Sequence, residues 1–439
     1  MDATNLEVSL EQLSHWRASQ AAYRGSRNQH LFVRLVGDIQ VDILRESFND
    51  VVNRHDLLQR SFNVFGSNLY FGPIEKDWSI DFTIIDLTTV PLDEREPQAL
   101  ETGRAMTRIE YDLSAPPLFS ARLFKINSDQ YILFLLIDHL VCDGWSASLF
   151  VKELSEFYNA RLGMRQARLR PLLQSFVEQT PASTAAALDN DTPETRRFWT
   201  ELLGPPATGP RWTRADGAAT GSTANHDTLV THRERWSAET SRRLQEASLA
   251  SGLTLFCLTL TAFGIALREL TGQHDFLLTT AVAGRQTRRK FYLIGLFRKI
   301  ILLRFRPNRA SPLSQQARDV NEMISTVFSH QEGPTGRYLI ASLLEGGDLA
   351  AEPHCTTSFI WQNYPGGGIS FDGIESEEIL AEFAGGDEEL DAFYWMERGQ
   401  VHGVLKHDVN VFSVMDITAL GALVERAARD LAESLLEGS

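Results

Sequence analysis

The segment Tyr131–Gly144, YILFLLIDHLVCDG, decides the fold of the first half of the chain. Its first seven residues are apolar apart from the Tyr131 hydroxyl, and a short β-prone run of this kind predicts a buried strand. The strand ends at Asp138 and His139, and an Asp-Gly pair follows after three intervening residues. We therefore expect a buried strand that delivers His139 at its end.

A helix is predicted directly after Gly144. Five apolar residues fall on one helical stripe: Leu149, Phe150, Leu154, Phe157 and Tyr158. Ser146 is expected to cap the helix. His139 is thus expected between a rigid strand and a helix N-terminus. A neutral imidazole there can accept a proton, and the backbone N–H groups of the helix start can face a developing oxyanion.

This HxxxDG arrangement resembles the acyltransferase superfamily that includes chloramphenicol acetyltransferases and the condensation domains of non-ribosomal peptide synthetases. Condensation domains have two histidines at the start of the motif, so that Asp138 makes this chain a DHxxxDG variant. Residues 9–16, SLEQLSHW, resemble the opening motif S-x-A-Q-x-R-L-W of these domains, and residues 54–62, RHDLLQRSF, resemble R-H-E-x-L-R-T-x-F. Further stretches match in the same order along the chain: 197–203, 275–285 with 294–297, 330–332 and 361–363.

The resemblance covers nearly the whole chain and implies its fold. We expect an α/β (α+β) protein of two chloramphenicol-acetyltransferase-like lobes, which form a V-shaped pseudo-dimer with a central channel. Strand and helix patterns alternate in both halves of the sequence and agree with two such lobes. The expected boundaries are an N-terminal lobe over 1–180, a linker region over 181–226 around a short helix, RRFWTELL, and a C-terminal lobe over 227–439.

The resemblance also implies roles for the site residues. His139 would position and deprotonate the acceptor, and the backbone N–H of Gly144 would donate to the oxyanion. Asp143 would pair with Arg285 of the other lobe and hold the geometry. Each residue also has a plainer interpretation, because a lone histidine is more often a satisfied core residue and an Asp-Gly pair suits a solvent-exposed turn.

Asp138 is the main departure from the family motif. It can preserve the structural polar contact of the missing histidine, or it can place an anion beside His139 and favour the protonated, non-basic imidazole. If its side chain points away, as the alternation of a strand predicts, we expect catalysis to survive. Two other departures are Lys299, where the family has asparagine, and the stretch 172–179, which matches the expected aromatic motif only faintly.

Two further groups of residues are weaker candidates. Trp145, Trp361 and Asn363 are expected in the substrate channel, although aromatic residues in strands more often belong to a core. Arg288, Arg289 and Lys290 are expected to dock an acidic carrier protein, although a basic cluster is more often a solvated surface.

Composition excludes several classes of protein. Among 439 residues, 42 basic and 57 acidic side chains give a net charge of −15, which opposes nucleic-acid binding. Three distant cysteines without a CxxC pair argue against a zinc site or a disulfide framework, and they suit a reducing cytoplasm. No secretory signal is visible, and the longest apolar tract, 253–267, is shorter than the roughly 20 residues of a membrane span. We expect no metal and no membrane partner.

The leading functional hypothesis is a stand-alone, monomeric condensation enzyme. It would transfer an acyl group from the phosphopantetheine thioester of an acyl or peptidyl carrier protein, bound in trans, to a small amine or alcohol, without a bound cofactor. One alternative is a non-catalytic condensation-like module that recruits a carrier or partner enzyme. Heterocyclisation is a second alternative, because Asp138 and Asp143 reproduce the DxxxxD spacing of cyclisation domains. A hydrolase with Ser146 as nucleophile is the weakest, since the final glycine of its motif is missing.

Overall fold

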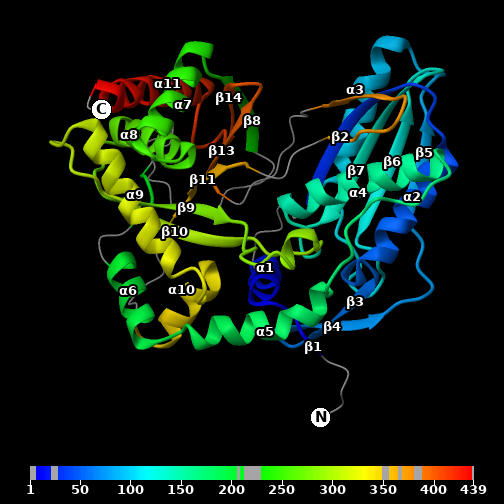
Figure 1. Cartoon of the computed structure of the whole chain (residues 1–439), viewed down its shortest axis with the longest axis horizontal. Coiled ribbons are helices and arrows are strands. Elements are labelled where there is room, and N and C mark those ends of the chain that lie inside the picture. The colour runs from blue at the N-terminus through cyan, green and yellow to red at the C-terminus, as the bar shows by residue number, and fades with distance from the viewer. Residues whose placement is uncertain are drawn as a thin grey trace. The chain divides into compact units, whose positions relative to one another are not determined.

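The computed structural model describes residues 6–20, 28–204, 208–211, 229–348, 355–363, 368–379 and 388–437 (Figure 1). The chain divides into two compact units. The first comprises Met1–Ala185, Ala283–Arg298 and Tyr364–Phe383, and the second comprises Ala186–Val282, Lys299–Asn363 and Ala384–Ser439. The segments 283–298 and 364–383 therefore group with the first unit, although they lie within the range that the sequence assigned to the C-terminal lobe.

The expected linker region contains helical structure. It includes most of α5 (Phe176–Asp189) and all of α6 (Pro193–Leu203), which begins with a Thr192 cap. Residues 205–207 and 212–226 of this region lie outside the described residues.

A five-stranded sheet forms the centre of the first unit. Its strand β7 (Gln130–Asp138) pairs antiparallel with one neighbour along its whole length and with the other over residues 131–137. The order of the sheet is β12 (Glu375–Glu378), β2 (Asn28–Val36), β7, β6 (Phe119–Lys125) and β5 (Asp81–Asp86). The edge strand β12 comes from the distant segment 364–383, which explains why that segment groups with the first unit.

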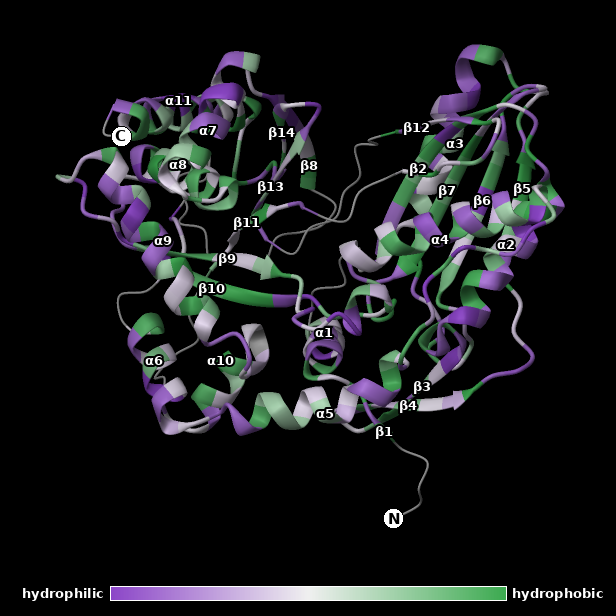
Figure 2. Ribbon diagram, viewed as in Figure 1, coloured by the Kyte–Doolittle hydropathy of each residue, from purple (hydrophilic) through white to green (hydrophobic). Residues whose placement is uncertain are grey.

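The apolar run of β7 is continuous because both faces of the strand are buried. Leu133, Leu135 and Ile137 pack in a cluster that includes α2 (Val41–Arg54) and α4 (Gly144–Leu162), whereas Ile132, Phe134 and Leu136 pack in a cluster that includes α3 (Leu92–Met106). Figure 2 shows the central strands mostly in hydrophobic colours. A one-residue slip would exchange these two sets, so the packing fixes the position of His139 after the strand.

The first unit also contains a smaller sheet and further helical elements, among them α1, η1 and η3 (Lys290–Tyr292). The sheet has the order β1 (Leu6–Glu7), β4 (Asn68–Ile74) and β3 (Arg60–Phe65), and η1 (Asp56–Gln59) precedes β3. Helix α1 (Leu10–Gln20) begins with a capping box, in which the Ser9 hydroxyl accepts from Gln12 N and the Gln12 side chain accepts from Ser9 N.

The second unit is built on a six-stranded sheet. The order is β10 (Lys299–Phe305), β9 (Phe276–Val282), β11 (Thr357–Trp361), β13 (Leu390–Glu397), β14 (Gln400–Asp408) and β8 (Leu229–Arg235). The strands β13 and β14 form an antiparallel hairpin. The helices of this unit, besides α6, are α7 (Ala238–Ser251), α8 (Leu255–Thr271), α9 (Leu313–Ser329), α10 (Gly336–Glu345) and α11 (Val414–Glu437).

The mixed α/β fold class expected from the sequence is confirmed by this architecture. The apolar tract 253–267 lies mostly in α8, whose side chains are largely buried in the core of the second unit. Within the described residues no single helix has the length and apolar composition needed to cross a membrane. The helices α7 and α8 reach that length and apolar composition only when they are taken together, and they are bent by 118° relative to each other.

Candidate active site

His139 lies in the turn that follows β7, and only 7% of it is exposed. The turn is held by Val141 N, which donates to Asp138 O at 3.1 Å, and by Leu140 N, which donates to the Asp138 carboxylate at 2.7 Å. The buried strand and this short turn together fix the backbone of His139. Its neighbour Cys142 is fully buried, and burial raises the pKa of this thiol well above 9.0, so that Cys142 is not a thiolate nucleophile.

Asp138 continues the face of β7 that packs towards α3. Leu136, two residues earlier on the same face, belongs to the α3-side cluster, and its carbonyl accepts from the Tyr111 hydroxyl at 3.0 Å. The Asp138 charge adds to the burial that raises the pKa of Tyr111. The Asp138 carboxylate therefore serves the turn as an acceptor for Leu140 N and lies on the strand face that Tyr111 contacts.

Asp143, rather than the expected Ser146, caps α4. Asp143 Oδ1 accepts from Ser146 N at 2.8 Å, and Oδ2 accepts from Phe297 N at 3.0 Å and Arg298 N at 3.1 Å. Only 2% of this residue is exposed. The carboxylate thus joins the start of α4 to the segment 283–298. Because Asp143 is buried, it does not belong to a solvent-exposed Asp-Gly turn, which was the plainer interpretation of the sequence.

Arg285 reaches the same carboxylate from the segment 283–298. Its Nη2 lies 3.1 Å from Asp143 Oδ1, and the two side chains are 1% and 2% exposed. Nη2 also donates to Ser146 Oγ at 2.6 Å, and Nη1 donates to the carbonyls of Leu293, at 2.8 Å, and Lys290. Desolvation lowers the pKa of Arg285, and the Asp143 charge opposes that shift. A buried pair with this many hydrogen bonds holds geometry more than it adds stability.

Gly284 allows Arg285 to take this position. Its φ is +64°, and a Cβ atom at this residue would lie 1.9 Å from the Phe297 carbonyl oxygen. The chain can pass so close to Phe297 only with a glycine at position 284. The Arg285 guanidinium carbon then lies 4.1 Å from the centroid of the Phe297 ring, in cation–π contact.

Ser146 and Trp145 connect α4 to the segment 291–297 through hydrogen bonds. Ser146 is fully buried, its Oγ donates to Gly295 O at 2.8 Å, and the same Oγ accepts from Gly295 N at 3.1 Å. Trp145 Nε1 donates to Phe291 O at 3.1 Å. A hydroxyl engaged in this way is a structural group, which disfavours the hydrolase alternative. Trp145, expected in a channel, is partly exposed and anchors the helix start.

The sequence did not predict the buried cluster around Glu153, in the third turn of α4. Glu153 is 2% exposed, and its carboxylate accepts from Arg54 Nε at 3.0 Å and lies 2.8 Å from His55 Nε2. His55 Nδ1 accepts from Ile294 N at 3.4 Å, which leaves Nε2 to donate to Glu153. The only signal was the Arg-His pair of the motif at 54–62, whose partner on α4 lies nearly 100 residues away.

The other predicted residues are divided between the two units. Arg288 and Arg289 are exposed and Lys290 is partly exposed, on the first unit beside the Arg285 anchor. Trp361, at the end of β11, and Asn363 belong to the second unit. Lys299, which stands where the family has asparagine, also lies in the second unit, and its Nζ donates to Gln331 O at 2.8 Å.

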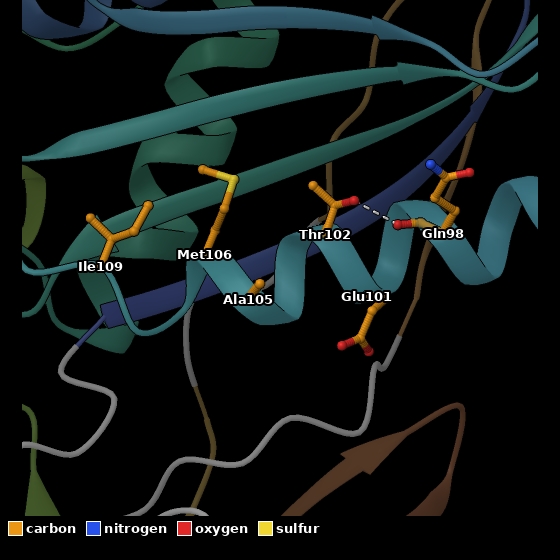
Figure 3. A pocket seen from close by; sticks show the side chains of 6 residues that line it. All are labelled: Gln98, Glu101, Thr102, Ala105, Met106 and Ile109. Carbon is orange, nitrogen blue, oxygen red and sulfur yellow. Dashed lines mark hydrogen bonds between the residues drawn. The ribbon is translucent and has the colours of Figure 1, made fainter.

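A depression of about 530 Å³ lies along α3 in the first unit (Figure 3). Its lining contains none of the predicted site residues and consists of Gln98, Glu101, Thr102, Ala105, Met106 and Ile109. Among the residues that the structure describes, no three His, Cys, Asp or Glu side chains gather as a metal site requires.

A family model described as a condensation domain matches residues 4–392. The chain belongs to the condensation-domain family. The expectation drawn from the DHxxxDG segment and its companion motifs is thereby confirmed. Bacitracin synthase 3 from Bacillus licheniformis is 23% identical over 363 residues, which are 81% of this chain and 5% of that protein. The chain thus spans only a small part of the length of the curated relatives it matches.

Solved condensation-type structures share the fold. The first condensation domain of the calcium-dependent antibiotic synthetase, in complex with a substrate analogue, matches with a TM-score of 0.79 and 16% identity over 99% of both chains. The complex of the X-domain and OxyB from teicoplanin biosynthesis matches with a TM-score of 0.81 and 17% identity, over 99% of this chain and 94% of the other. At these identities the likeness establishes the fold alone.

Proposed function

We propose that this condensation domain is a stand-alone enzyme of natural-product biosynthesis. It transfers an acyl group from the phosphopantetheine thioester of a carrier protein to a small amine or alcohol, and so forms an amide or an ester. The observation that carries the proposal is the position of His139. This residue follows the buried strand β7, and the helix after its turn is held in place by the buried pair of Asp143 and Arg285. Family membership supports this reaction class.

In the proposed reaction the acceptor lone pair attacks the thioester carbonyl carbon, and the carbonyl oxygen becomes an oxyanion. His139 orients the acceptor and takes its proton. Collapse of the tetrahedral intermediate then breaks the carbon–sulfur bond, and the proton held by His139 neutralises the leaving thiolate. Gly144 is the first residue of α4, and its N–H has no intrahelical acceptor, so we assign it as the donor to the oxyanion. Asp143 and Arg285 hold this helix start and do not touch the substrate.

The donor reaches the enzyme on a partner protein. We propose that an acyl or peptidyl carrier protein presents it in trans, on its phosphopantetheine, and that the enzyme holds no cofactor of its own. The exposed Arg288 and Arg289, with Lys290, offer cations to an acidic carrier on a chain whose overall charge is −15. Trp145, Trp361 and Asn363 remain proposed channel residues. We place the enzyme in the reducing cytoplasm, which suits its three free cysteines. We also propose that it acts as a monomer.

Asp138 gives one alternative a specific basis. It removes the first histidine of the motif, and one structural neighbour is an X-domain bound to OxyB, which is a partner complex. A module that only recruits a carrier or partner would tolerate this loss. A recruiting module does not need His139 for its function, whereas an acyltransferase does.

The experiment that tests the proposal supplies the purified chain with acyl-pantetheine or acyl-carrier donors and a mixed panel of amines and alcohols. Products are identified by mass spectrometry. An amide or ester that forms with the wild type and is lost with His139→Ala supports acyl transfer and identifies the acceptor atom. A product lighter than the amide by one water supports heterocyclisation instead. Carrier binding without any product supports the recruiting module.

A further inference from the structure

A second histidine contacts His139. The ring of His15, on α1, has its centroid 5.1 Å from that of the His139 ring, and the two planes are tilted by 47°. His15 is partly exposed, whereas His139 is buried. The opening motif S-x-A-Q-x-R-L-W has leucine at the position of His15. An imidazole at this point is therefore a departure from that motif, as Asp138 is from the HHxxxDG motif.

Helix α1 is fixed against the turn that carries His139. Gln12, which is fully buried, donates from Nε2 to Leu140 O at 2.9 Å, and the capping box with Ser9 holds the same side chain. Gln12 and His15 are three residues apart, so they share one face of the helix. The anchor at Leu140 thus determines the contact of His15 with His139, which immediately precedes Leu140.

We propose that His15 is a positioning residue of the acyl-transfer site, which packs against His139 and opposes protonation of its imidazole. The inference rests on the proposed role of His139 as proton acceptor. Two imidazoles in contact repel each other when both are protonated, so the pair titrates as a coupled unit. His15, which is closer to solvent, takes up the first proton, and His139 then remains neutral to a lower pH.

The charges of the surrounding elements give this arrangement a reason. On the loop and the segment packed on it, Asp143 and Arg285 compensate each other, and Cys142 stays a neutral thiol. The Asp138 carboxylate, which accepts from Leu140 N at 2.7 Å, adds a negative charge to the same loop.

On α1 the ionisable neighbours of His15 are Glu11, four residues before it, and Arg17, which binds Ser67 O and Asn68 on β4 and the turn before it. Glu11 lies about one helical turn from His15, on the same face of α1. The imidazole of His15 therefore offsets the anion that stands in place of the first motif histidine.

The test is a proton-binding titration of His139 in the full chain, by NMR of ¹³Cε1-labelled histidine. The chain has 11 histidines, and the His139 signal is identified by its loss in His139→Gln. The variants are His15→Phe, which keeps an aromatic ring, and His15→Leu, which restores the family residue. His402→Leu is the matched control, because His402 is also partly exposed and stacks on an aromatic ring, that of Trp395, in the second unit.

We expect both His15 variants to raise the pH midpoint of His139 by roughly one unit, the size of a Coulomb interaction over this distance at a partly solvated site. His402→Leu should leave it unchanged. The acid limb of the kcat/KM profile should move to higher pH by the same amount. A His139 midpoint that stays at the wild-type value in both variants, with folding intact by circular dichroism, overturns the proposal. A shift in His15→Leu that His15→Phe abolishes also overturns it, since ring packing alone would then be responsible.

The NMR readout does not depend on turnover. A wild type without acyl transfer but with the expected shift refutes the proposed function and leaves the coupling of the two rings established. A wild type with acyl transfer but no shift refutes the role of His15 alone.

Discussion

The replacement of Arg285 by methionine tests whether Asp143 and Arg285 lock the start of α4. Methionine keeps most of the side-chain volume but removes the four hydrogen bonds that Arg285 donates, to Asp143, Ser146, Leu293 and Lys290. It also leaves the Asp143 carboxylate buried without its cation. Removal of one partner of a buried ion pair costs about 3–5 kcal/mol. Asp143 keeps three backbone N–H donors, so we expect about 3 kcal/mol for Arg285→Met.

The converse variant, Asp143→Asn, leaves the guanidinium buried and presents an amide to N–H groups that need an acceptor. We expect a larger loss, about 4–5 kcal/mol. The double variant removes both charges, so its loss should be smaller than the sum of the two single losses by about 2–3 kcal/mol. Arg161→Met is the matched control. Arg161 forms a two-bond pair with Asp50, at 2.6 and 2.9 Å, but its side chain is 39% exposed, and such a pair is worth at most about 1 kcal/mol.

Hydrogen–deuterium exchange of peptides from β7 and α4 measures this stability locally, which suits a chain of two compact units. A loss of about 3 kcal/mol corresponds to exchange faster by about 100-fold in the limit where opening is rapid. Arg161→Met should change exchange by less than about fivefold. If Arg285→Met behaved like Arg161→Met, or if the losses of the two charge variants simply added, the pair would not hold the helix start.

Three further predictions concern other parts of the chain. Gly284→Ala should expose the segment 283–298 to limited proteolysis, because its Cβ would lie 1.9 Å from Phe297 O; a proteolysis pattern like that of the wild type would contradict this. Asp138→Asn, which keeps an acceptor for Leu140 N, should preserve more acyl transfer than Asp138→Ala, which removes it; equal rates would show that the turn does not need this bond. Glu234 in β8 has its pKa raised from 4.5 to about 7, first by burial, so the folded state binds the proton more tightly than the unfolded state. The free energy of unfolding of the second unit should therefore fall as pH rises from 4.5 to about 7. Glu234→Gln should flatten this pH dependence in hydrogen-exchange experiments on β8 and β14. An unchanged slope would rule out Glu234 as the source of the pH dependence.

The sequence predicted the elements whose burial pattern is strong. The run in β7 is apolar on both faces because α2 and α4 cover one side and α3 the other. The apolar tract 253–267 lies mostly in α8, where it is buried in the core of the second unit. These local signals depend on burial, which a single sequence records directly.

Other features depend on contacts between distant residues, and the sequence could not predict them. Asp143 rather than Ser146 caps α4, because the helix begins at Gly144 and Ser146 lies inside it. The Ser146 hydroxyl instead binds Gly295, which lies 149 residues away. The segment 364–383 joins the first unit through the pairing of β12 with β2, and the strand itself, ESEE, has no strand-like pattern. The contact of His15 with His139 likewise joins a helix to a turn that is distant in the sequence.

The most direct test of the proposed chemistry is a single turnover of acyl-loaded carrier protein with excess acceptor, followed by intact-mass spectrometry of the carrier. We predict that the wild type and His402→Leu discharge the acyl group onto the acceptor at similar rates, and that His139→Ala slows the transfer by about 100-fold or more, the usual contribution of a positioned general base. Acceptor-dependent discharge by His139→Ala at the wild-type rate would contradict the account.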